Sequence, residues 1–70
     1  MKNYVMVFDI PRELNATKIR VWRELQKIHA KKIQHSVWKS NKLDKLIEIA
    51  TLVKKSKGKA RILEEKLIFE

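Results

Sequence analysis

The chain opens with the stretch Tyr4-Val-Met-Val-Phe-Asp-Ile-Pro11, in which an apolar run ends in a single carboxylate. An uninterrupted run of this kind predicts a β-strand in the middle of a sheet. Asp9 stands at the end of that strand, directly before Ile10 and Pro11, where the chain must turn. Two interpretations of Asp9 stay open: it caps the turn, or it is the acid of a small polar site.

The residues after this strand predict a helix over 16–29, with Asn15 as its N-cap. Its apolar stripe recurs at three-residue spacing and consists of Ile19, Trp22, Leu25 and Ile28, with Val21 beside it. We therefore expect Trp22 in the hydrophobic core rather than at the surface as a platform for stacking bases.

Residues 31–40 alternate in the manner of β structure, but nothing in them marks a two-residue hairpin turn. One strand and two short strands therefore remain open alternatives. A second helix is expected to open at Asn41, which forms a loose capping box with Asp44 in the first turn. Gly58 follows the lysine-rich end of that helix and is predicted to be its C′ residue.

The predicted order is strand, helix, strand or strand pair, helix, strand. This order favours an α+β domain of ferredoxin-like βαββαβ topology, with two helices on one face of a small antiparallel sheet. We expect residues 1–70 to form one such domain. Because a domain of this size buries little surface, we expect a homodimer, in which the apolar tail within residues 64–70 completes a sheet or core on the partner.

The charge balance predicts a polyanionic partner, since 17 Lys and Arg face 8 Asp and Glu for a net charge of +9. Nucleic acid is the first expectation, and binding through the phosphates the expected mode. The candidate contacts are Arg12, Lys18, Arg20, Lys31, Lys32, Lys39, Lys54, Lys55, Lys57 and Lys59. No signal peptide or membrane-spanning segment is apparent, so we expect a cytoplasmic protein that does not bind membranes.

Catalytic motifs are few. The sequence has no glycine-rich phosphate loop, no cysteine and no closely spaced histidine pair. Asp9 is the one remaining candidate for catalysis and for binding a metal. A two-fold dimer would bring two Asp9 carboxylates together, and such a pair would suit Mg²⁺, which needs only one or two carboxylates when phosphate oxygens and water complete its shell.

Two motifs together resemble the Cas-two family of small CRISPR-associated proteins, the dimeric partner of the Cas-one integrase in spacer acquisition and antiviral defence. They are the opening strand with Asp9 and the run Ile33-Gln-His-Ser-Val-Trp38, and Lys18 and Arg20 match the family's basic first helix. The resemblance implies a ferredoxin-like homodimer with two facing Asp9 residues and an exchanged C-terminal strand. It also implies backbone binding of duplex DNA within the Cas-one assembly, while some members are described as metal-dependent nucleases. Lys18 and Lys32 stand where the family more often has Arg, and Trp38 stands in place of Phe.

Three hypotheses follow. The first is a non-catalytic scaffold that binds duplex DNA. The second is a Mg²⁺-dependent endonuclease acting on RNA or DNA through paired Asp9. The third is an unrelated RNA-binding ferredoxin fold of ribosomal type, which gives Asp9 no role.

Overall fold

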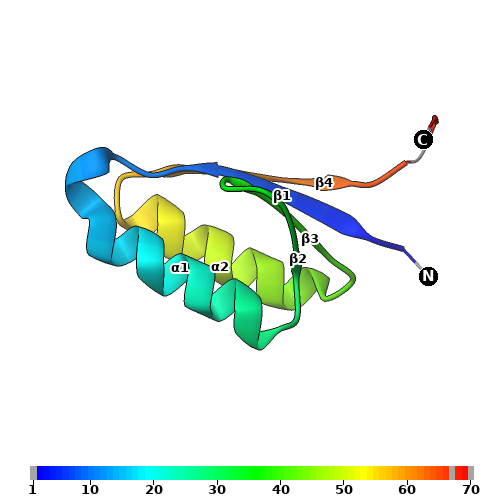
Figure 1. The fold of residues 1–70 in the computed structure, drawn as a ribbon, viewed down its shortest axis with the longest axis horizontal. Coiled ribbons are helices and arrows are strands. Elements are labelled where there is room, and N and C mark those ends of the chain that lie inside the picture. Colours follow the sequence, from blue (N-terminus) through cyan, green and yellow to red (C-terminus); the bar gives the residue numbers. More distant parts are fainter. Residues whose placement is uncertain (1, 67, 70) are drawn as a thin grey trace.

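Strand β1 (Tyr4–Asp9) lies inside a four-stranded antiparallel sheet of strand order β2-β3-β1-β4. The computed structural model describes residues 2–66 and 68–69. The chain continues through a 3₁₀ turn (Arg12–Leu14), α1 (Asn15–Lys27), β2 (Lys31–Gln34), β3 (Val37–Ser40), α2 (Leu43–Lys55) and β4 (Lys59–Glu64). Both helices lie on the same side of the sheet (Figure 1). The expected α+β fold is confirmed, and its topology is compatible with a ferredoxin-like arrangement.

The hydrophobic core fills the space between the sheet and the helices. Met6 and Phe8 point into it from β1, because alternate residues of a strand face opposite sides of a sheet. The other strands and the helices add Trp38, Val21, Leu25, Leu46, Ile49 and Val53. Ile19 is 38% exposed, so the predicted stripe of α1 is rotated, with Val21 buried in its place.

The helix N-termini differ from the prediction. Asn15 is already helical, at φ −59° and ψ −36°, because α1 continues directly from the 3₁₀ turn; its expected role as the N-cap is wrong. The cap position of α2 is Lys42 rather than Asn41, and the Lys42 side chain makes no capping hydrogen bond. The Lys42 amide donates to the Ser40 hydroxyl at 3.1 Å. This hydrogen bond to the last residue of β3 stabilises the turn between β3 and α2.

Both helices end in Schellman motifs. In α2 the Gly58 amide donates to the Val53 carbonyl at 3.0 Å, and the Lys57 amide donates to the Lys54 carbonyl at 3.2 Å. Lys57 therefore occupies C′, with a φ of 66°, and the prediction of Gly58 at C′ is wrong by one residue. His29 takes the same place after α1, with a φ of 58°.

Gly58 is needed for a different reason, which is close packing. A Cβ atom there would lie 2.7 Å from the Asp9 carbonyl oxygen and 2.7 Å from Val53 Cγ1. The absence of a side chain thus lets the start of β4 approach the end of β1, where Asp9 pairs with Lys59.

Residues 31–40 form two strands. β2 and β3 are joined by His35 and Ser36, with a register shift between Lys32 and Gln34. The His35 carbonyl accepts two indole N–H groups, from Trp38 at 3.1 Å and from Trp22 at 3.2 Å. The turn is therefore fixed by contacts with β3 and α1 rather than by residues typical of hairpin turns.

At the opposite end of the sheet, an ion pair joins the residues before β1 to the end of β4. Lys2 donates to Glu64 at 3.2 Å, and this hydrogen bond raises the pKa of Lys2 above its ordinary value. Of the segment expected to exchange with a partner, Leu67 and Glu70 lie outside the described residues, whereas Ile68 and Phe69 are 81% and 91% exposed.

Candidate nucleic-acid interface

The face of the sheet that turns away from the helices is uncovered and partly apolar. Cross-strand pairing places Val5, Val7, Val37 and Leu63 together on this open face. Val7 is 38% exposed and Leu63 is 48% exposed, while their neighbours Met6 and Phe8 on the other face are buried. Four cations share the open face with them: Lys31, Lys39, Lys59 and Arg61. The open face therefore combines an apolar centre with positive charge around it.

Asp9 lies at one end of the open face. It is exposed and lines a hollow of about 330 Å³ with Val7, Lys59, Arg61 and Leu63. Among the described residues its carboxylate neither accepts a hydrogen bond nor forms an ion pair, so nothing there supports a role in capping the turn.

Asp9 is the one acidic side chain among the described residues that line this hollow. The residues that the structure describes contain no group of three His, Cys, Asp or Glu side chains arranged to hold one. The other charged residues lining the hollow are Lys59 and Arg61, and cations oppose the binding of another cation. A metal at Asp9 would therefore need ligands from a second copy or from a substrate.

The opposite end of the open face is more basic. Lys31 and Lys39 are cross-strand neighbours, and Lys39 forms an ion pair with Glu65 at 3.2 Å. Beside them lies a hollow of about 280 Å³ that also includes His29 and Lys42 in its lining.

Lys18 and Lys32 belong to a second surface, on the helix side of the sheet. Lys18 Nζ lies 5.7 Å and Lys32 Nζ lies 5.5 Å from the centroid of the Trp22 ring. The His35 ring is 6.1 Å from the same indole, at an interplanar angle of 32°. Trp22 is half-buried. It packs against the core, as expected, and the ammonium groups of Lys18 and Lys32 lie near the same ring. We call these four residues the Trp22 cluster.

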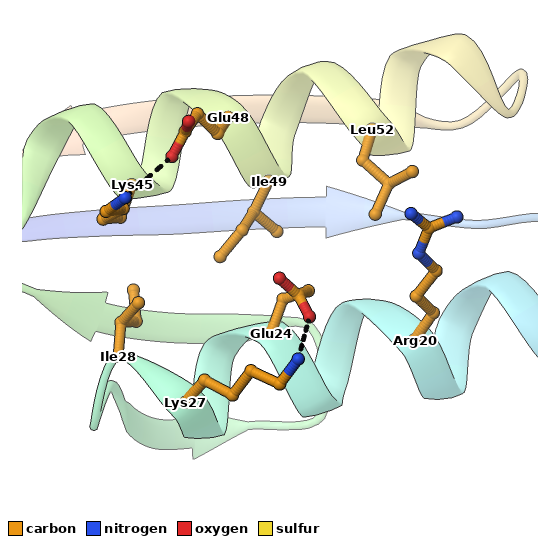
Figure 2. Close-up of a pocket in the computed structure, with 8 residues that line it drawn as sticks. All are labelled: Arg20, Glu24, Lys27, Ile28, Lys45, Glu48, Ile49 and Leu52. Carbon is orange, nitrogen blue, oxygen red and sulfur yellow. Dashed lines mark hydrogen bonds and ion pairs between the residues drawn. The ribbon is translucent and has the colours of Figure 1, made fainter.

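Arg20 belongs to neither surface. Figure 2 shows it extending from α1 towards Leu52 of α2, over a groove of about 510 Å³ between the two helices. The groove has Ile28 and Ile49 among its lining residues. Its other charged side chains pair within their own helices, Lys27 with Glu24 at 3.0 Å and Lys45 with Glu48 at 3.5 Å.

The remaining predicted contacts lie near the junction of α2 and β4. Lys54 and Lys55 are in the last turn of α2, Lys57 is at its C′ position, and Lys59 begins β4 opposite Asp9. Arg12 is exposed in the 3₁₀ turn that follows β1.

The ten predicted cations therefore occupy several surfaces rather than one. Lys31 and Lys32 are adjacent in sequence but face opposite sides of β2, because Lys31 pairs with Lys39 and Lys32 pairs with Trp38. Arg61 was not among the predicted contacts. The alternation of Lys59, Arg61 and Leu63 along the last strand was the signal that could have placed it beside Asp9.

Comparison of the chain with protein-family models finds no match, and comparison with curated proteins finds none either. Neither helix in the described part of the chain has the length and apolar character needed to cross a membrane.

Proposed function

We propose that this protein is a homodimeric nucleic-acid-binding scaffold that acts in CRISPR spacer acquisition with a Cas-one integrase, and that it binds duplex DNA through the phosphates. The observation that carries the proposal is the open face, on which exposed Val7 and Leu63 lie among Lys31, Lys59 and Arg61. The resemblance of the Asp9 strand and of residues 33–38 to the Cas-two family supplies the biological setting.

A second copy is the best occupant for the centre of the open face. Antiparallel sheets tolerate one solvated face when it is polar, but here Val5, Val7, Val37 and Leu63 form its middle. A two-fold axis through this face would bury the apolar side chains against themselves. The resemblance implies that the two Asp9 residues face each other in such a dimer.

Duplex DNA fits the cations that remain around that centre. Of the four cations on the open face, only Lys39 forms an ion pair among the described residues, so Lys31, Lys59 and Arg61 can contact an external anion without first losing an internal carboxylate partner. Such contacts tolerate sequence variation, and each phosphate neutralised makes the slope of log affinity against log salt about 0.9 more negative. A protein with several contacts should therefore lose affinity steeply with salt.

The dimer is tested by comparing wild type, Val7→Lys and Ile47→Lys by sedimentation velocity. Ile47 is a matched control, because it is an apolar side chain that is 50% exposed on α2 and its replacement adds the same charge. We expect Val7→Lys alone to be monomeric at micromolar concentration. A wild-type monomer, or equal behaviour of the two variants, would contradict the proposed interface.

Nucleic-acid binding is tested by fluorescence anisotropy of labelled duplex DNA over a range of salt concentrations. Affinity that hardly changes with salt would refute binding through phosphates. The role in spacer acquisition further predicts a stable complex with a Cas-one integrase subunit, which co-sedimentation would detect.

The second candidate function is a Mg²⁺-dependent endonuclease that uses both Asp9 residues of the dimer. Its support is the position of Asp9 on the open face with no hydrogen-bond or ion-pair partner among the described residues. The assay is cleavage of labelled RNA and duplex DNA with Mg²⁺ or EDTA, by wild type and Asp9→Ala. Cleavage lost with both EDTA and the variant would assign the activity to Asp9, and bound but intact substrate would favour the scaffold.

A further inference from the structure

The Trp22 cluster holds two unneutralised cations around one aromatic ring. Lys18 precedes Trp22 by one helical turn, and Lys32 reaches the same indole from β2, so both ammonium groups lie within 5.7 Å of its centroid. None of the ion pairs in the described part of the chain includes Lys18 or Lys32. Contact with a ring leaves an ammonium group charged, so the cluster keeps its capacity to bind an anion.

The indole itself is held in a fixed orientation. Its N–H donates to the His35 carbonyl at 3.2 Å, and that oxygen also accepts the N–H of buried Trp38 at 3.1 Å. The exposed His35 ring lies 6.1 Å from Trp22 and continues the aromatic surface outward from α1. A half-buried ring that is anchored at one edge can present aromatic surface to a ligand without first being ordered.

We propose that the Trp22 cluster binds single-stranded nucleic acid, with a base stacked on Trp22 and the adjacent phosphates held by Lys18 and Lys32. An exposed cation–π contact is generally weaker than the stacking of a base on an aromatic side chain. A base can therefore displace the flexible lysine side chains from the ring, and their ammonium groups then move to the flanking phosphates. Duplex DNA cannot do the same, because its bases are already stacked within the helix.

This inference rests on the proposed nucleic-acid binding but names a different ligand for a different surface. Lys32 lies on the helix side of β2, whereas Lys31 and Lys39 lie on the open face. Single strands and duplexes should thus respond differently to changes at Trp22.

The test compares wild type, Trp22→Phe and Trp22→Leu, after circular dichroism has shown that each variant is folded. Binding is measured by anisotropy with a labelled oligothymidylate and with a labelled duplex, in the same buffer. We expect Trp22→Leu to weaken single-strand binding about tenfold, and Trp22→Phe, which keeps an aromatic ring, to retain most of it. Duplex affinity should change little in either variant.

A second measurement does not depend on replacing Trp22. Its fluorescence in the wild-type protein should be quenched by the oligothymidylate and not by the duplex, while the contribution of buried Trp38 stays constant. Two results would overturn the single-strand site. One is the absence of quenching by the oligothymidylate, and the other is an equal loss of affinity for the oligothymidylate and the duplex in Trp22→Leu. If duplex binding persists in that case, the proposed function stands; if neither ligand binds the wild type, both proposals fail.

Discussion

Replacement of Gly58 by Ala provides a direct test of how β4 is joined to β1. The added Cβ would lie 2.7 Å from the Asp9 carbonyl oxygen, 2.7 Å from Val53 Cγ1 and 3.0 Å from the Val53 carbonyl. Two of these atoms belong to the backbone, and the Val53 side chain is fully buried, so none can move aside freely. Overpacking of this kind costs about 1–3 kcal/mol, and the lower entropy of the unfolded Ala chain returns only about 0.4–1 kcal/mol.

We therefore expect Gly58→Ala to lower the free energy of unfolding by about 1–2 kcal/mol. For a domain of 60–100 residues this corresponds to a fall in Tm of roughly 4–16 °C. Thermal unfolding followed by circular dichroism, at equal protein concentration, measures the change. An amide spectrum should also show the largest shifts at Asp9 and Lys59, which pair across this junction.

The control is Lys57→Gly, one residue earlier in the same turn. Lys57 has a φ of 66°, a conformation that glycine adopts without strain, so this variant should raise Tm. An unchanged Tm in Gly58→Ala would refute the packing argument. A fall in Tm in Lys57→Gly would refute the reasoning from the left-handed conformation of Lys57.

Three further outcomes are expected. His29→Gly should stabilise the protein by about 1 kcal/mol, because His29 holds the left-handed C′ position of α1 at a φ of 58°; chemical denaturation measures it. Trp38→Phe should destabilise it by about 1–2 kcal/mol in the same assay, since the smaller ring leaves part of the buried volume empty and removes one donor to the His35 carbonyl. Glu65→Gln should strengthen duplex binding, because it frees Lys39 to contact a phosphate. The slope of log affinity against log salt should become steeper by the amount expected for about one phosphate contact, and anisotropy at several salt concentrations would detect this.

The sequence predicted the architecture because hydrophobic pattern and element order carry most of that information. The run from Tyr4 to Phe8 gave the central strand, and the two periodic segments gave the helices. What it could not predict depended on tertiary contacts. The turn at His35 and Ser36 has no typical turn residue, because two indole N–H groups from Trp22 and Trp38 hold it in place.

The candidate site was less predictable than the fold. Lys31 and Lys32 are adjacent in the chain, but the strand alternation places Lys31 on the open face and Lys32 against Trp22. Arg20 lies on α1 one turn from Glu24 and faces the groove between the helices. The composition gives the amount of charge, whereas the pairing register decides which cations share a surface.

Duplex DNA and single-stranded nucleic acid can be bound by different surfaces of the same dimer. A second copy on the open face would cover Val7 and Leu63, which face away from the helices. The Trp22 cluster lies on the other side of the sheet, on α1 and the helix side of β2, so such a dimer leaves it accessible. Dimerisation would then duplicate the cluster. A scaffold of this kind would present cations to a duplex around the dimer interface and an aromatic site to an unpaired strand on each outer side, with no side chain required for both tasks.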